Sequence, residues 1–264
     1  LIGAVILMSF IVITGYVGQV SVVQLAVSGT AGFLLSHLTL GAGLGFPVAA
    51  LVAVAAATAL GVATGISALR VRGVSLAVVT LAAALAIEQA LFVNTSFGGV
   101  GGGVPSASPQ LFGFQLGTDA PFRGLDGAQP SPVFGLLVLA VTVALGLCVA
   151  NLRRTGLGRQ MLAVRSNERA AAAAGVNVRE VKVAAFTISS FVASVAGVLY
   201  GYNFNSVSST RFSALAALTL LGLGALGAWI TAAVSPDVLR WVLGLSFIGM
   251  AVWTLIPDAI EEDE

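Results

Sequence analysis

Residues 151–182 read NLRRTGLGRQMLAVRSNERAAAAAGVNVREVK, and this charged stretch decides how the chain is arranged. Long apolar runs lie on both sides of it. It holds seven of the twelve basic residues of the chain: Arg153, Arg154, Arg159, Arg165, Arg169, Arg179 and Lys182. A basic island between two apolar runs is typical of a loop at a membrane surface.

The middle of this island has the local signals of a helix. Ser166 or Asn167 can accept a hydrogen bond from a free amide of the next turn. Glu168 then stands where a helix N-terminus favours negative charge. Residues 170–174 are alanines, which have the highest helix propensity.

A glycine break and a second helix follow. Gly175 is expected to end the first helix. Asn177, with Glu180 three residues later, has the pattern of a capping box, in which each residue bonds the other's backbone or side chain at a helix start. We therefore predict a helix, a glycine break and a helix at the membrane surface.

The composition defines the class of protein. Hydrophobic residues make up 58% of the 264 residues and charged residues 9%, and the mean hydropathy is +1.02. Soluble proteins are about 25% charged. Because a spanning helix needs about 20 apolar residues, we predict one all-α, polytopic membrane domain over residues 1–264, with about seven spanning or re-entrant helices, in a range of about six to eight. A net charge of +1 gives no reason to expect a nucleic-acid partner.

The first two apolar runs are residues 1–14 and 15–33. The chain begins at Leu1 and its first run is short, so we expect an upstream part. The second run is rich in glycine and polar residues, which are costly against lipid and should face other helices or an aqueous path. Both interpretations stay open, and the candidates for a path are Gly15, Tyr16, Gly18, Gln19 and Gln24.

Further apolar runs complete the bundle, at residues 48–69, 73–93, 133–150, 183–203, 214–234 and 239–256. The pairs Gly61/Gly65 and Gly197/Gly201 have the four-residue spacing that allows close helix packing. Glu88 is the only acid well inside a run. It is either a functional residue of the path or a side chain that reaches the membrane interface.

The basic residues set the expected topology. Arg70 and Arg72 flank a short connection that, like residues 151–182, should be cytoplasmic. The glycine- and proline-rich segment 94–132 is then an irregular extracytoplasmic loop. Its glycines are not a phosphate cradle, because a P-loop needs Gly-Lys-Ser/Thr and the only lysine is Lys182, within Val-Lys-Val.

The sequence also excludes several chemistries. One histidine, His37, and one cysteine, Cys148, cannot form a metal site alone, and no cofactor or catalytic triad is expected. We expect His37 at a helix end. The leading class is a transporter or channel subunit. Ion-coupled carriers usually keep several ionisable groups within the bilayer, whereas this chain has one acid within its spans. The energy for transport should therefore come from another source than ion coupling.

Three blocks of the sequence carry a resemblance: GYVGQVSVVQLAVSG (15–29), LRVRGVSLAVVTLAAALAIEQALFVNTSFGGVGG (69–102) and LRRTGLGRQMLAVRSNERAAAAAGVNVREVKVAAFTISSFVASVAGVLYGYNFNSVS (152–208). They resemble the LivM-type permease of branched-chain amino acid ABC importers. The resemblance covers about four fifths of the chain, to near Phe212, and the third block is the most specific.

This resemblance implies an ABC importer permease fold in the bacterial inner membrane that works by alternating access. It implies four kinds of partner: a second similar permease, two cytoplasmic ATPases, a periplasmic substrate-binding protein and membrane lipid. Residues 151–182 would be the loop that docks in an ATPase, through Arg159, Arg165, Asn167, Glu168, Ala170, Ala171 and Gly175. Arg159, Arg165 and Arg169 would pair with acids there. The alternative for this loop is a basic helix attracted to anionic lipid.

The resemblance weakens beyond about Ser213, so residues 213–264 form an atypical C-terminal part. Residues 238–264, VLRWVLGLSFIGMAVWTLIPDAIEEDE, instead resemble the last helix of small membrane cation/proton exchangers. The alternative functions are therefore a cation/proton exchanger-like protein and a non-transporting composite membrane protein.

Overall fold

The computed structural model describes residues 1–68, 74–98, 103–106, 109–111, 114–115 and 132–222. The chain forms two compact units, Leu1–Leu220 and Leu221–Glu264, and the described residues lie almost entirely in the first. The elements are α1 (Ile2–Phe10), the π-helical η1 (Ile11–Val17), α2 (Val23–Ser36), η2 (His37–Gly41), α3 (Val48–Ala68), α4 (Val74–Ile87), η3 (Glu88–Phe92), α5 (Thr95–Gly98), β1 (Gly103–Pro105), β2 (Gln110–Leu111), β3 (Phe114–Gln115), α6 (Pro132–Leu152), α7 (Gly156–Ser166), α8 (Glu168–Ala173), α9 (Val178–Phe204), β4 (Ser206–Ser208) and the 3-10 helix η4 (Ser209–Phe212).

Helices dominate the described residues, and the strands are only two or three residues long. Within the described residues, five helical segments are long and apolar enough to cross a membrane: Val23–Gly41, Val48–Ser67, Ser75–Phe92, Phe134–Leu152 and Val178–Phe204. Ile2–Val17 is a shorter apolar helix. The all-α polytopic prediction is confirmed. The predicted run 214–234 is described only to residue 222, and the run 239–256 lies outside the described residues.

The predicted boundary between the first two apolar runs is wrong. The chain does not break at residues 14 and 15, because Gly15 lies inside the helix that α1 and η1 form together. Gly18 ends this helix with φ 73°, a left-handed conformation that glycine adopts at little cost. The second helix begins only at Val23, eight residues later than the predicted start of the second run.

Helix α9 lies at the centre of the bundle and packs against α1, α2 and α3. Its approach to α2 is very close, since a Cβ at Gly197 would lie 1.8 Å from the backbone oxygen of Ser28. Gly61 of α3 similarly lies against Ser190 of α9. The second glycine of each pair also faces a neighbouring helix, so both Gly-x-x-x-Gly pairs serve packing, as predicted.

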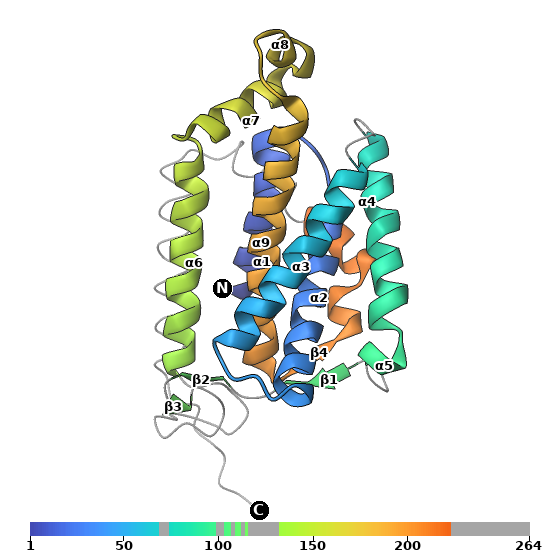
Figure 1. Cartoon of the computed structure of the whole chain (residues 1–264), viewed down its shortest axis with the longest axis vertical. Helices are drawn as coiled ribbons and strands as arrows, with labels where there is room; N and C mark the ends of the chain where they lie inside the picture. Colours follow the sequence, from blue (N-terminus) through green and yellow to red (C-terminus); the bar gives the residue numbers. More distant parts are fainter. Residues whose placement is uncertain (69–73, 99–102, 107–108, 112–113, 116–131, 223–264) are drawn as a thin grey trace, which may run out of the picture. The chain divides into compact units, whose positions relative to one another are not determined.

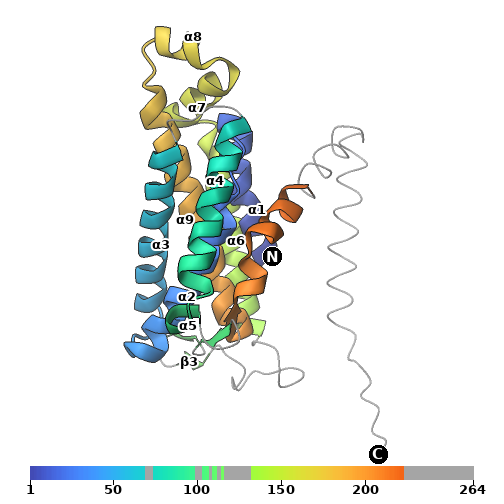
Figure 2. The ribbon, with the colours of Figure 1, turned by 90° about the vertical axis from the view of Figure 1, so that its right-hand side faces the viewer.

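The loops sort to two ends of the bundle (Figures 1 and 2). At one end, β1 pairs with β4 antiparallel, which joins the predicted outer segments 94–132 and 203–212. His37 lies at this end, where α2 stops, and its Nε2 is 2.8 Å from the carbonyl oxygen of Phe97. Helices α7 and α8 lie at the other end. Arg70 and Arg72 lie outside the described residues.

Candidate functional site: the α7–α8–α9 loop

Helix α7 begins the loop and was not predicted as a separate helix. The hydroxyl oxygen of Thr155 accepts a hydrogen bond from the backbone N–H of Gly158 (3.1 Å), which caps the helix. Gly158, Met161 and Val164 form its buried face, at spacings of three residues. This spacing, after a threonine cap, is the sequence signal that could have revealed α7.

Helix α8 follows with the predicted start and end. The side-chain oxygen of Asn167 accepts bonds from the backbone N–H groups of Arg169 (3.0 Å) and Ala170 (3.1 Å). Ser166 donates instead to the carbonyl of Ala163 (2.8 Å), so Asn167 is the cap. Gly175 follows α8 with φ 84°, which confirms the glycine break.

The start of α9 also has the predicted capping box. The side-chain oxygen of Asn177 accepts a bond from the backbone N–H of Glu180 (3.4 Å), and its amide nitrogen donates to a carboxylate oxygen of Glu180 (2.7 Å). Two sharp turns thus separate three helices within 49 residues, from Gly156 to Phe204. The loop has a defined shape that side-chain hydrogen bonds hold at each turn.

A buried ion pair joins α8 to α9. The ammonium nitrogen of Lys182 lies 2.6 Å from a carboxylate oxygen of Glu168; the Lys182 side chain is 4% exposed and that of Glu168 30%. The sequence analysis counted Lys182 among the basic residues of the loop and used its neighbours to exclude a P-loop, but it did not predict this ion pair. The signal was available, because a lysine one turn inside an apolar helix needs a counter-charge.

The remaining predicted docking residues differ in their exposure. Ala171 is buried, whereas Ala170 and alanines 172–174 are exposed, so α8 presents a surface of small side chains. Arg159 and Arg169 are also exposed. A surface of alanines allows another protein's backbone to come close, and exposed guanidinium groups can pair with its acids.

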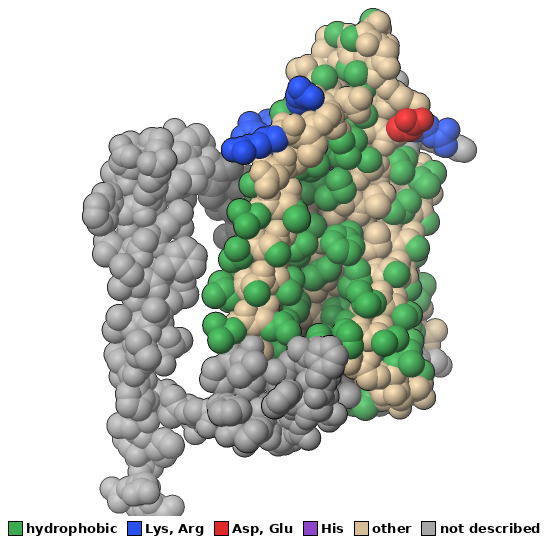
Figure 3. Space-filling model, turned by 60° about the vertical axis from the view of Figure 1, so that its left-hand side comes forward, with side chains coloured by type: hydrophobic (Ala, Val, Ile, Leu, Met, Phe, Trp, Pro, Cys, Tyr) green, Lys and Arg blue, Asp and Glu red, His purple; other side chains and the backbone are tan. Residues whose placement is uncertain are grey.

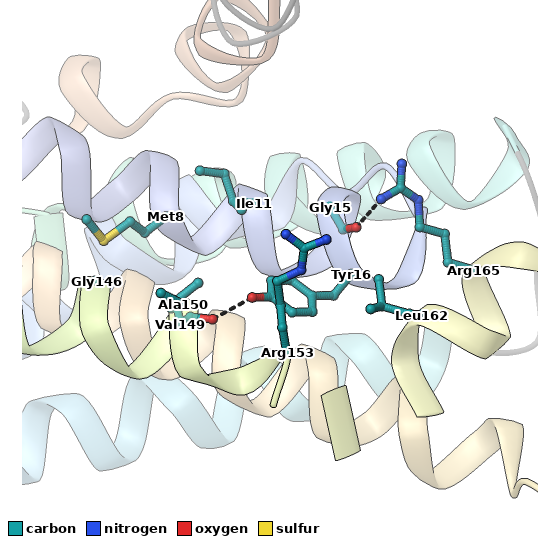
Figure 4. A pocket seen from close by; sticks show the side chains of 10 residues that line it. All are labelled: Met8, Ile11, Gly15, Tyr16, Gly146, Val149, Ala150, Arg153, Leu162 and Arg165. Atoms are coloured by element: carbon teal, nitrogen blue, oxygen red, sulfur yellow. Dashed lines mark hydrogen bonds between the residues drawn. The ribbon is translucent and has the colours of Figure 1, made fainter. Parts of the chain in front are cut away.

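Part of the predicted path lies against this loop (Figure 4). A guanidinium nitrogen of Arg165 donates to the carbonyl oxygen of Gly15, and the Arg165 side chain lies over Gly18. The hydroxyl of Tyr16 donates to the carbonyl oxygen of Val149 in α6. Gly15, Tyr16 and Gly18 therefore connect the loop to η1 and α6.

The other path candidates lie deeper, between helices. Gln19 is 9% exposed and Gln24 is fully buried. Neither amide atom of Gln24 has a hydrogen-bond partner among the described residues, and the buried hydroxyls of Ser21, Ser28 and Ser190 lack one as well. A buried polar group without a partner costs about 1–3 kcal/mol. The buried position of Gln24 fits both expected roles of this run, packing against other helices and lining a polar path.

Glu88 makes a specific contact that the sequence did not indicate. A carboxylate oxygen accepts a bond from the backbone N–H of Ala214 (2.9 Å), at the first turn of the helix over residues 214–222. A carboxylate is favourable at a helix N-terminus. The structure thus gives Glu88 a role in holding this helix.

The site contains no metal centre in the part of the chain that the structure describes, since no cluster of three metal-binding side chains occurs there. Five apolar helices of spanning length among the described residues define a multi-pass membrane protein.

Comparison with known proteins identifies the family. The family described as "Branched-chain amino acid transport system / permease component" matches residues 2–257, and the chain belongs to it. The match includes residues 213–257, where we expected an atypical part. The family membership and the spans confirm the resemblance to LivM-type permeases.

Individual proteins with names that indicate different cargoes are similar to the chain over different lengths. The high-affinity branched-chain amino acid transport permease LivM of Escherichia coli K12 is 34% identical over 253 residues, covering 83% of this chain and 58% of LivM. The ribose import permease RbsC of the same organism is 32% identical over 196 residues, covering 69% of this chain and 56% of RbsC. A Vibrio cholerae protein named as a manganese exporter is 47% identical over 51 residues, covering 18% of this chain and 26% of that protein.

The chain spans little more than half the length of LivM and RbsC. No solved structure matches it.

Proposed function

We propose that this chain is a membrane-spanning subunit of an importer for branched-chain amino acids in a bacterial inner membrane. Two ATPases would bind from the cytoplasm and supply the energy. A second, similar permease would complete the membrane part, and a periplasmic binding protein would deliver substrate at the β1–β4 end. The similarity to LivM supports the substrate class.

The observation that carries this proposal is the ion pair between Lys182 and Glu168. It connects an exposed helix, α8, to α9, which packs against α1, α2 and α3. A partner that moves α8 would thereby move α9 relative to α2. The buried polar side chains lie on these two helices, so this movement would open or close the path between them.

The polar group also fits the proposed substrate. It consists of amide and hydroxyl side chains, Gln24, Ser28 and Ser190. Neutral groups of this kind can bond both the ammonium and the carboxylate of an amino acid, and the surrounding apolar helices suit an aliphatic side chain. Hydroxyl-rich sugars need a denser set of polar partners, although RbsC shows that sugar permeases occur among the relatives.

Reconstitution tests the proposal. The chain is combined with its partner subunits in proteoliposomes, and uptake of leucine is compared with uptake of ribose. ATP-dependent uptake of leucine and not ribose is expected. Uptake of ribose alone would overturn the substrate class, and leucine uptake without ATP would overturn the energy source.

A substitution on α8 tests the docking surface. Ala173→Trp places a large side chain on the exposed face of α8 and should release the ATPase during purification. The matched control is Ala55→Trp, on the exposed face of α3, which should retain it. Equal retention of the ATPase by both variants would contradict docking at α8.

A further inference from the structure

A second feature at the α8 end of the bundle is a cavity of about 570 Å³ between η1, α6 and α7 (Figure 4). Arg153, Arg165 and Tyr16 line its polar part, and Met8, Ile11 and Leu162 line its apolar part. Arg153 and Arg165 come from different segments of the chain. No acid lies among the described residues that line it.

The apolar part borders a face of α6 that is exposed in this chain. Helix α6 packs against α1 but is only 17% buried over its span, and its exposed side chains include Leu139, Val143 and Leu147. Gly146 contributes no side chain to the wall, so space remains beside Met8, whose terminal carbon would be 3.3 Å from a Cβ at Gly146. Ile11 is 50% exposed on the opposite wall.

The polar part lies at the edge of the membrane. Arg153 directly follows the span Phe134–Leu152, and α7 has one buried face and exposed arginines, as expected of a helix at the interface. Figure 3 shows basic side chains gathered near this end of the described helices, above a broad hydrophobic surface. The two arginines therefore lie at the depth of lipid headgroups.

These features define the ligand chemistry. A guanidinium group matches the geometry of phosphate oxygens, and basic pockets between spanning helices suit anionic headgroups. A zwitterionic headgroup would bring a second cation beside Arg153 and Arg165, with no acid among the described lining residues to pair with it. A free phosphate ion would leave the walls at Met8 and Ile11 without a partner.

We propose that this cavity binds an anionic phospholipid, with its phosphate between Arg153 and Arg165 and its acyl chains along Met8 and Ile11. A phosphate bound to both arginines would connect the end of α6 to α7, and through the bond from Arg165 to the Gly15 carbonyl also to η1. The proposal needs only that the chain lies in a membrane. It holds or fails independently of the transported substrate.

Native mass spectrometry of the purified chain tests it directly. Phosphatidylglycerol or phosphatidylcholine is added in detergent, and the fraction of lipid-bound chain is measured for the wild type, Arg153→Gln, Arg165→Gln and the double variant. The affinity for phosphatidylglycerol should fall about fivefold for each arginine and about thirtyfold for both. Arg154→Gln is the matched control, since Arg154 is adjacent and exposed but does not line the cavity.

Each outcome of this experiment either supports or overturns the lipid site. Selective binding of phosphatidylglycerol that the double variant loses and the control keeps would support the site. Equal binding of both lipids, or equal loss in the control, would overturn it. Displacement of the lipid by excess inorganic phosphate would assign the cavity to a free anion instead. Arg153→Gln alone carries the test if the double variant does not fold, and monodisperse elution in size-exclusion chromatography checks its folding.

Discussion

Substituting Glu168 and substituting Lys182 should lower the free energy of unfolding by different amounts, although each breaks the same ion pair. Glu168→Gln leaves a lysine charge that is 4% exposed without its carboxylate. Removal of one partner from a buried ion pair typically costs about 3–5 kcal/mol, and because Glu168 is 30% exposed we expect the lower end, about 3 kcal/mol. Lys182→Met instead leaves a carboxylate that water can reach, and we expect about 1 kcal/mol.

The double variant, Glu168→Gln with Lys182→Met, should be about as stable as Lys182→Met alone, because no buried charge remains. The assay is thermal unfolding in detergent, where 1 kcal/mol corresponds to about 2–4 °C for a chain of this size. The melting temperature should therefore fall by about 6–12 °C for Glu168→Gln and by about 2–4 °C for the other two variants. Equal effects of the single substitutions, or additive effects in the double variant, would refute the reasoning.

Substitutions at three further contacts are tested by the same unfolding assay. Gly197→Ala should destabilise the protein by about 3 kcal/mol or more, because the added Cβ meets the α2 backbone. The control Gly135→Ala has open space around it and should stabilise the protein by up to about 1 kcal/mol. Equal effects of the two substitutions would contradict the close packing of α9 on α2. Asn167→Ala should cost about 1 kcal/mol through loss of the α8 cap, and Asn167→Asp should restore most of it. Glu88→Ala should cost about 1–3 kcal/mol because the backbone N–H of Ala214 loses its acceptor; no change would show that water replaces it.

Local signals explain what the sequence predicted well. Asn167, Gly175 and Asn177 act on backbone groups at most three residues away in the turns that they form, so their roles follow from short-range chemistry. Apolar runs of membrane length predicted the spans for the same reason. In a bilayer, the backbone N–H and C=O groups of each run must form their hydrogen bonds within the run's own helix.

The contacts that sequence reasoning missed join distant residues. Glu88 bonds a backbone group 126 residues away, and Arg165 one 150 residues away. Such pairs depend on which helices become neighbours in the fold, and no local sequence pattern indicates that. The first helix boundary failed for a different reason. Gly15 and Gly18 look alike in the sequence, and only the backbone conformation shows which of them ends the helix.

We propose that α8 is a cytoplasmic helix that a partner ATPase covers. Labelling tests this most directly: Ala173→Cys is made in a Cys148→Ser background, since Cys148 is the only native cysteine. A membrane-impermeant maleimide should label Ala173→Cys in inverted membrane vesicles but not in intact cells, and bound ATPase should protect the site. Labelling in intact cells, or labelling that the ATPase leaves unchanged, would contradict the account.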